Sequence, residues 1–217
     1  MFTGLVETIA AVVAATPSGA ALRLSVDLGK AAEGVRLGDS ISLSGVCQTV
    51  AALSGTVAAF DAVPETLAKT TLGLWRPGTR VNIERSLRPA DRLGGHFVAG
   101  HIDATGRVIE NGIRGGGWWL RIEAPADLFV EIAPKGSIAI DGVSLTVVDA
   151  RAPEFSVTVI PTTLRETTLG DRRVGDAINL ETDLLAKYVR RALTAITGAG
   201  SDDRRLLDTL SKSGFLD

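Results

Sequence analysis

The chain has 217 residues, and its 23 Lys and Arg against 25 Asp and Glu give a formal net charge of −2. This balance argues against nucleic-acid binding as the main activity, because neutralising phosphates requires clustered basic residues. The single cysteine excludes an intrachain disulfide and argues against a cysteine-based zinc site. With only two histidines, the chain is also poorly supplied with ligands for a multi-histidine metal site.

The sequence predicts no targeting segment and no membrane span. The first seven residues contain no basic region, and Glu7 interrupts the apolar run early. No apolar stretch approaches the ~20 residues that a membrane-spanning helix needs. We therefore expect a cytoplasmic protein in a reducing compartment, with no membrane partner.

The chain contains an internal duplication. Three segments of the first half recur in the second half at one offset and without gaps: 41–50 with 138–147, 64–73 with 161–170, and 78–84 with 175–181. Roughly a third of the aligned positions are identical, well above chance for so long an ungapped match. A unit that occurs twice predicts paired domains, at 1–96 and 97–183, followed by a tail at 184–217.

Within each half, apolar and polar residues alternate with a period of two. The alternation is clear at 22–26, 41–43, 155–159 and 178–180, and it indicates half-buried strands. Gly55 and the two residues before it predict a hairpin turn. Many short strands with glycine punctuation favour a closed antiparallel barrel or a sandwich.

Residues 66–73 are less strand-like and predict a short helix closed by Gly73, with a copy at 163–170. Residues 183–193 have helical spacing, with an apolar stripe formed by Leu185, Tyr188, Val189 and Ala192. This stripe packs either on another subunit, which we favour, or on the body of the same chain. Residues 198–201 then break the helix, and a second short helix is predicted from Asp202 or Asp203 through Leu210.

Five motifs in this order resemble the riboflavin synthase family of the α-chain type. They lie at 1–7 (MFTGLVE), 44–50 (SGVCQTV), 94–103 (GGHFVAGHID), 141–147 (DGVSLTV) and 184–188 (LLAKY). The resemblance runs from Met1 to about Leu193. Gln48 is a mild departure, because an apolar residue is frequent there in the family.

The resemblance implies an all-β fold of two tandem homologous six-stranded antiparallel Greek-key barrels plus a C-terminal α-helix. It implies that two molecules of 6,7-dimethyl-8-ribityllumazine exchange a four-carbon unit, giving riboflavin and 5-amino-6-ribitylaminouracil. No cofactor and no metal are needed. It also implies a homotrimer in which the first barrel of one subunit faces the second barrel of its neighbour. Association with lumazine synthase stays open.

The duplication suits a reaction between two identical molecules, since it supplies two related pockets. Donor and acceptor play different roles, so the pockets should differ in ionisable groups. The aligned positions do differ: Cys47 with Ser144, Leu5 with His101, Ser44 with Asp141, and Gly38 with Lys135. The second half therefore holds most of the titratable residues.

His101 is the first catalytic candidate, because an imidazole exchanges protons near neutral pH and the reaction requires deprotonation of a methyl group. The alternative is a structural histidine bonded to backbone. His96 is a weaker candidate that could simply shape its Gly-Gly turn.

Ser144 and Thr146 alternate on a predicted strand and so share a face, as do their copies Cys47 and Thr49. Paired hydroxyls can hold a pyrimidinedione edge or orient a water, although cross-strand hydroxyl bonding without a ligand is the alternative. For Cys47 we favour a pocket-lining role over covalent catalysis.

Three further charged residues are candidates. Lys135 could reach an anionic ring or the ribityl chain, or could be a solvated turn lysine, and the resemblance brings it to the ligand of a neighbouring subunit. Asp141 opens the motif at 141–147 and could orient the Ser144 loop. Asp183 either caps the tail helix or, on the resemblance, lies near the reacting pair beside Ser144 and His101.

The resemblance also implies substrate-binding stretches around each pocket, partly through backbone groups. Those of the first half are Gly4, Leu5, Val6, Cys47, Gln48, Thr49, Asp61, Ala62, Val63, Pro64, Glu65 and Thr66. Those of the second half are Gly100, His101, Ile102, Lys135, Ser144, Leu145, Thr146, Thr158, Val159, Ile160, Pro161, Thr162 and Thr163.

The alternative function is a non-catalytic lumazine- or flavin-binding protein of the optical antenna type. Such relatives keep the duplicated barrels but lose part of the catalytic set in one half. Here His101, Ser144, Cys47 and Asp183 are all present, which favours the enzyme.

Overall fold

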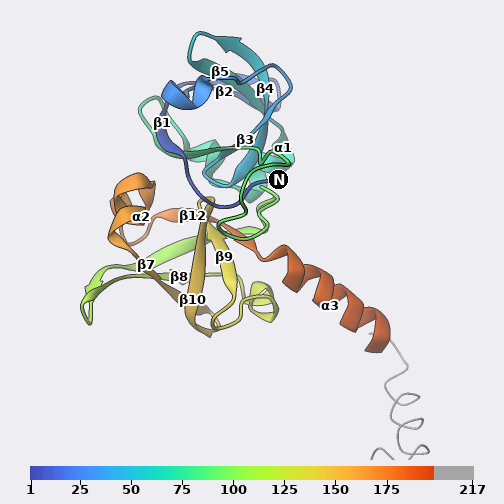
Figure 1. Ribbon diagram of the computed structural model, residues 1–217, viewed down its shortest axis with the longest axis vertical. Helices are drawn as coiled ribbons and strands as arrows, with labels where there is room; N and C mark the ends of the chain where they lie inside the picture. Colours follow the sequence, from blue (N-terminus) through green and yellow to red (C-terminus); the bar gives the residue numbers. More distant parts are fainter. Residues whose placement is uncertain (198–217) are drawn as a thin grey trace, which may run out of the picture. The chain divides into compact units, whose positions relative to one another are not determined.

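The computed structural model describes residues 1–197, and its strands form two closed six-stranded antiparallel barrels (Figure 1). In the first barrel the order around the wall is β1-β2-β5-β4-β3-β6, with β1 Thr8–Ser18, β2 Ala21–Asp27, β3 Ser40–Leu43, β4 Val46–Ser54, β5 Val57–Ala62 and β6 Arg80–Arg85. In the second barrel the order is β10-β11-β8-β7-β12-β9, with β7 Ala104–Arg114, β8 Gly117–Glu123, β9 Ser137–Ile140, β10 Val143–Arg151, β11 Glu154–Val159 and β12 Ala177–Thr182. The predicted fold is confirmed.

Short helices connect some of these strands. The first barrel has the 3-10 helices η1 (Gly29–Ala32) and η2 (Thr71–Leu74) and the α-helix α1 (Pro64–Lys69). The second barrel has η3 (Ala126–Val130), α2 (Pro161–Glu166) and η4 (Thr168–Asp171).

The duplication extends to the strand bounds. β1 begins at Thr8 and its copy β7 at Ala104, while β3 begins at Ser40 and its copy β9 at Ser137. All six strands of the first barrel have a copy of the same length in the second. The predicted repeat is therefore structural as well as sequential.

Each barrel is filled by its own apolar side chains. Along β2, Leu24 and Val26 are fully buried, whereas Arg23, just before Leu24, forms an ion pair with Asp61 on the outer face. Phe60 on β5 and Phe155 on the equivalent strand β11, at positions two residues apart in the repeat, are fully buried aromatic side chains of the two cores. Because the interiors are packed, a ligand must bind outside the barrels or between them.

The connection after β5 differs in detail from the sequence prediction. The helix predicted at 66–73 begins earlier, at Pro64, and ends at Lys69, so Gly73 does not close it. Thr70 is extended, donates its hydroxyl to the Thr66 carbonyl and accepts the Leu72 N–H, which ends α1 and caps η2. Thr167 does the same between α2 and η4, so the copy predicted at 163–170 is shifted alike.

The hairpin predicted at Gly55 lies between β4 and β5, with Gly55 at its turn and the preceding Ser54 still in the strand. The tail helix is present as α3 (Leu184–Thr197). It belongs to a separate compact unit that begins at Leu184. The chain break predicted at 198–201 and the second helix predicted beyond it lie outside the described residues. Within residues 1–197, no helix is long and apolar enough to cross a membrane.

Two buried asparagines join the barrels. The Asn82 amide donates to the Asp141 carbonyl (2.9 Å) and accepts the Thr168 N–H (2.8 Å), both in the second barrel. Asn179 makes the mirrored bonds to the Ser44 carbonyl (2.9 Å) and from the Thr71 N–H (2.8 Å) in the first. Both side chains are almost fully buried, so losing either would leave several unpaired polar groups.

Gly45 and Gly142 meet at this junction. A Cβ on Gly142 would lie 2.6 Å from the Gly45 backbone nitrogen, and a Cβ on Gly45 would lie 2.7 Å from that of Gly142. Both residues also have positive φ, 85° and 76° respectively, which side chains rarely tolerate. The two backbones can approach this closely only because both positions are glycine.

We expect Gly142→Ala to destabilise the protein far more than Gly55→Ala. Gly55 also has a positive φ, of 59°, but a Cβ there meets nothing within 4 Å, so this control carries the backbone strain alone. The added clash at Gly142 should lower the free energy of unfolding by about 1–3 kcal/mol more than in the control. Urea unfolding measures the difference, and equal losses in the two variants would contradict close packing at the junction.

Candidate functional site

The segment that precedes each barrel runs along the other barrel. We call residues 2–5 and 98–101 the first and second entry segments. The Gly4 carbonyl accepts the N–H of Ser144 on β10 (2.8 Å), and the Gly100 carbonyl accepts the N–H of Cys47 on β4 (2.8 Å). Each entry segment therefore borders the candidate pocket of the opposite barrel.

The two entry segments also pair with each other. Phe2 and Val98 exchange backbone hydrogen bonds of 2.7 and 3.1 Å, and their side chains are fully buried. Gly4 and Gly100 have positive φ, and a Cβ on either would lie 2.6 Å from the Cβ of Ser144 or Cys47, respectively. The glycines thus bring the backbone of one half directly against the candidate strand of the other.

A cavity of about 280 Å³, which we call the first-barrel cavity, lies beside β4 and α1. It is lined by Val46, Cys47, Val63, Glu65, Thr66, Lys69, Thr70, Gly100, His101 and Ile102. This volume is slightly below the ~300 Å³ at which small-molecule sites typically begin. Residues from the predicted binding stretches of both sequence halves therefore meet in one cavity.

His101 belongs to the second half of the sequence but lines this cavity together with Cys47. The reason is the crossing of the second entry segment, which carries His101 to the first barrel. The cavity also holds an ion pair between Lys69 and Glu65 (3.6 Å) on successive turns of α1. It thus combines an exposed imidazole, a half-buried thiol and a charged pair.

Side chains alternate between the two faces of β4 and of β10, so Gln48 and Leu145 lie on the opposite face from the other predicted contacts on these strands. Cys47 is half-buried and Thr49 exposed, whereas Gln48 between them is buried with its amide donating to the Cys47 carbonyl (2.9 Å). Along β10, Ser144 is half-buried and Thr146 exposed, while Leu145 packs against the core of the second barrel. The hydroxyl and thiol faces therefore lie outside the barrels, and Gln48 and Leu145 lie on the opposite faces of their strands.

Ser144 is hydrogen-bonded to His96, the weaker of the two histidine candidates in the sequence. The distance between Ser144 Oγ and His96 Nδ1 is 2.7 Å, and the His96 backbone N–H donates to the Thr3 carbonyl (3.1 Å). The His96 side chain is buried, and within the described residues its Nε2 has no hydrogen-bond partner. We call this pair, with Gly4 and Leu5 beside it, the Ser144–His96 cluster.

Burial lowers the pKa of His96 below its ordinary value of 6.5, and the carboxylate of Asp183 partly offsets this by attracting the protonated form. The imidazole is therefore neutral at pH 7. A neutral ring beside a hydroxyl can hold it in one orientation and accept or donate a proton. Asp183 acts on His96, so the structure brings together Ser144, His96 and Asp183, with His101 in the first-barrel cavity instead.

Asp141 lies in the barrel junction. Its side chain is fully buried, accepts the Asn179 N–H (2.9 Å) and forms an ion pair with Arg172. Its copy Ser44 accepts the Asn82 N–H in the same way (3.1 Å). Burial raises the pKa of Asp141, and Arg172 opposes that effect. These bonds hold the carboxylate away from solvent, and a role of Asp141 in orienting the Ser144 loop stays a prediction.

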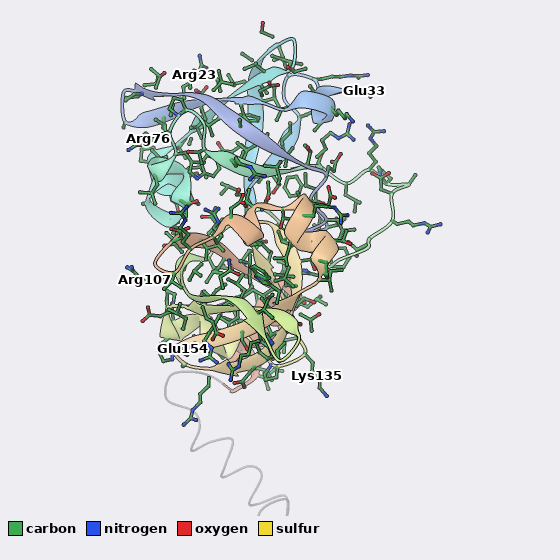
Figure 2. The ribbon with its side chains drawn as sticks, turned by 90° about the vertical axis from the view of Figure 1, so that its left-hand side faces the viewer. Arg23, Glu33, Arg76, Arg107, Lys135 and Glu154 are labelled. Carbon is green, nitrogen blue, oxygen red and sulfur yellow. The ribbon has the colours of Figure 1, made fainter. Side chains whose placement is uncertain are left out.

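Lys135 and Asp61 lie at the protein surface. Lys135 has a positive φ of 68° in the turn before β9, and its side chain is exposed on the second barrel (Figure 2). Its backbone N–H donates to the Val147 carbonyl (2.8 Å). Asp61 accepts two hydrogen bonds from Arg23, each of 2.8 Å, so its carboxylate is already engaged on the outer face of β5.

The predicted stretches around Pro64 and Pro161 join a strand to a helix in each half. Val63 and Ile160 are exposed just before α1 and α2, while Ala62 and Val159 are buried at the strand ends. Thr158, Pro161 and Thr162 are exposed and Thr163 is half-buried. Val6 packs partly against the second core. Within the described residues, no group of three or more His, Cys, Asp or Glu is placed to hold a metal ion.

Sequence reasoning missed two buried glutamates, Glu84 on β6 and Glu181 on β12, which hold the backbone of the entry segments. A signal was present, since both glutamates end the matching repeat segments 78–84 and 175–181, at a strand position where a charge is unusual. Their partners lie about 80 residues away, and nothing local in the sequence indicates them.

Comparisons with known proteins agree with the duplicated barrels. The family model of the lumazine binding domain matches twice, at residues 3–86 and 99–183. A riboflavin synthase of Actinobacillus pleuropneumoniae is 38% identical over 215 residues, covering 99% of this chain and 100% of the relative. A riboflavin synthase of Mycobacterium tuberculosis (strain ATCC 25618 / H37Rv) is 42% identical over 198 residues, covering 89% and 98%.

Two solved structures have a similar fold. A crystal structure of LumP complexed with 6,7-dimethyl-8-(1'-D-ribityl) lumazine has a TM-score of 0.76 at 24% identity, covering 84% of this chain and 99% of LumP. A crystal structure of LumP complexed with riboflavin has a TM-score of 0.76 at 26% identity over the same shares.

We expect His96→Gln to change how stability depends on pH. Because the folded pKa of His96 lies below its unfolded value, unfolded chains take up its proton first, and the wild type loses stability as pH falls below about 6.5. The variant lacks this contribution, so the difference in unfolding free energy between the two proteins should shift steadily in the variant's favour as pH falls. Urea unfolding at pH 7.5, 6.5 and 5.5 measures it, and a pH-independent difference would contradict the lowered pKa.

Proposed function

This chain belongs to the lumazine binding domain family, and from that premise we propose that it is a riboflavin synthase. The reaction is the dismutation of two 6,7-dimethyl-8-ribityllumazine molecules. A four-carbon unit leaves one molecule and joins the other, giving riboflavin and 5-amino-6-ribitylaminouracil. All atoms and electrons of the two substrates are found in the two products, so neither an oxidant nor a reductant is needed.

One structural observation carries the proposal: the chain has two related outer faces with different proton-transfer groups. The face of β4 offers Thr49 and Cys47, the latter in one cavity with His101, and the face of β10 offers Thr146 and Ser144, the latter bonded to His96. A reaction between two copies of one molecule in unlike roles requires such a pair of sites. Orientation of two bound rings can supply about 7–11 kcal/mol of the barrier in the best intramolecular cases.

We assign the residue roles as follows. Cys47, Thr49 and the backbone at the start of α1 line the lumazine site of the first barrel, with His101 as the group that exchanges a proton with the ligand. Ser144 and Thr146 contact the lumazine of the second barrel, and His96 orients the Ser144 hydroxyl, supported by Asp183. Asp141 positions the turn that leads into β10.

The oligomeric state is part of the proposal. We infer a homotrimer in which the second-barrel face of one subunit meets the first-barrel face of the next, completing a two-lumazine site that could include Lys135. The apolar stripe of α3 supports subunit contact, because Leu185, Tyr188 and Val189 are each more than half exposed. Light scattering tests this directly, since a trimer has three times the 22.6 kDa chain mass. A cytoplasmic location and association with lumazine synthase stay predictions.

The second candidate function is lumazine or flavin binding without catalysis. The similarity in fold to LumP favours it. The two functions differ in turnover, not in binding, so a binding assay alone does not separate them.

We expect the purified protein to convert 6,7-dimethyl-8-ribityllumazine into riboflavin without added metal or cofactor, with one riboflavin formed per two lumazines. Absorbance follows the reaction. His101→Gln and Ser144→Ala should lower kcat by about 10²-fold or more if each takes part in proton transfer. Ile113→Thr, at a side chain 78% exposed on β7, should keep the wild-type rate.

Tight lumazine binding with no turnover would contradict the enzyme and leave the non-catalytic binder. Neither binding nor turnover would mean that the family fold is present without its ligand chemistry.

A further inference from the structure

Glu84 is a buried carboxylate whose hydrogen bonds all go to the first entry segment. Its Oε1 accepts the backbone N–H and the hydroxyl of Thr3, both at 2.6 Å, and its Oε2 accepts the N–H of Gly4 at 3.0 Å. The side chain is 5% exposed. Burial raises the pKa of Glu84, and the hydrogen bonds from Thr3 and Gly4 oppose this by stabilising the charged form.

Glu181 repeats this arrangement in the second barrel. Its Oε1 accepts the N–H of Ala99 at 2.7 Å, and its Oε2 accepts the N–H of Gly100 at 3.0 Å. The side chain is 1% exposed. When two carboxylate oxygens accept hydrogen bonds from two successive N–H groups, they fix the orientation of the backbone between these groups. A single acceptor atom does not fix that orientation.

The glycine that each glutamate holds is also the residue that contacts the opposite pocket strand. Gly4 donates its N–H to Glu84 and accepts the Ser144 N–H with its carbonyl. Gly100 donates its N–H to Glu181 and accepts the Cys47 N–H with its carbonyl. Only one residue therefore separates each carboxylate from the pocket strand of the other barrel.

We propose that Glu84 and Glu181 are positioning residues that act crosswise: Glu181 of the second barrel sets the geometry of the first-barrel cavity, and Glu84 of the first barrel sets that of the Ser144–His96 cluster. Glu181 anchors the segment that carries His101 to Cys47. Glu84 anchors the segment whose Thr3 carbonyl accepts the His96 N–H and whose Gly4 carbonyl accepts the Ser144 N–H.

The catalytic consequence rests on the proposed function, whereas the positioning itself does not. If each pocket is shaped from the opposite barrel, a change at either glutamate alters one pocket and spares the other. A role confined to general stability would instead affect both pockets together, because they share one junction. A selective effect on the pocket of the opposite barrel therefore distinguishes the positioning role from a role in general stability.

The chain offers separate reporters for the two pockets. Cys47 is the only thiol, and its rate of reaction with an aromatic disulfide reports on the first-barrel cavity. The two histidines are divided between the pockets, so the ¹⁵N and ¹³C shifts of the His101 and His96 imidazoles, recorded at pH 8 and assigned with single His→Gln variants, report on one pocket each.

The experiment compares Glu84→Gln with Glu181→Gln. A glutamine presents one acceptor oxygen and turns an NH₂ group toward the second backbone N–H, so one bond is lost in each variant. Asp39→Asn is the control, since it weakens a carboxylate bond to backbone (to the Arg36 N–H, 2.9 Å) outside both pockets.

We expect Glu181→Gln to change the Cys47 reaction rate by about threefold to tenfold, the equivalent of one net hydrogen bond, and to move the His101 shifts but not those of His96. Glu84→Gln should move the His96 shifts and leave the Cys47 rate within twofold of the wild type. The control should change neither. Riboflavin formation should fall in both glutamine variants.

The proposal would be overturned if either variant changed both pockets equally. It would also be overturned if Glu181→Gln changed only the Ser144–His96 cluster or Glu84→Gln changed only the first-barrel cavity. If a glutamine variant fails to fold, Thr3→Val, which removes only the hydroxyl bonded to Glu84, and Glu181→Asp, which keeps the charge but shortens the reach, should give the same crossed pattern at smaller size. If the wild type makes no riboflavin, the proposed function fails, while the thiol and imidazole readouts still decide the positioning.

Discussion

The structure depends on the pairing of buried backbone groups across the junction of its two barrels. Unpaired N–H and C=O groups are costly away from water, and here their partners come from the opposite half of the chain. Asn82 and Asn179 each bond two backbone groups of the other barrel, and the two entry segments bond to β4 and β10. The candidate sites exist where they do because this requirement brings the entry segments against the pocket strands.

The duplication supplies a nearly symmetric frame, and a few substitutions make its two faces chemically different. Equivalent positions hold Cys47 and Ser144, bonded alike to a glycine carbonyl of the crossing segment. The histidines break the symmetry, since His101 lies beside Cys47 while His96 precedes its own entry segment and bonds Ser144. Two identical ligands can therefore bind in similar poses and meet different acids and bases, as an exchange between two like molecules requires.

The repeat, the strands and the barrel fold could be predicted from sequence, because the alternation of apolar and polar residues and the repeated segments are both visible in the order of residues along the chain. The assignment of His101 to a pocket could not, since an alignment of halves places each residue with its own half and contains no information on crossing segments. The end of α1 was missed because the Thr70 hydroxyl, which bonds in both directions, outweighs the glycine signal at Gly73. Glu84 was visible only as an unusual charge, since its backbone partners are distant in sequence.

The most direct test of two unlike sites in one chain is an equilibrium titration with riboflavin, followed by quenching of flavin fluorescence. We predict saturation at two riboflavin molecules per chain with two distinct affinities, because Cys47 and His101 on one side and Ser144 and His96 on the other offer different contacts. Saturation at one molecule per chain, or at two with a single affinity, would contradict the presence of two functionally different faces.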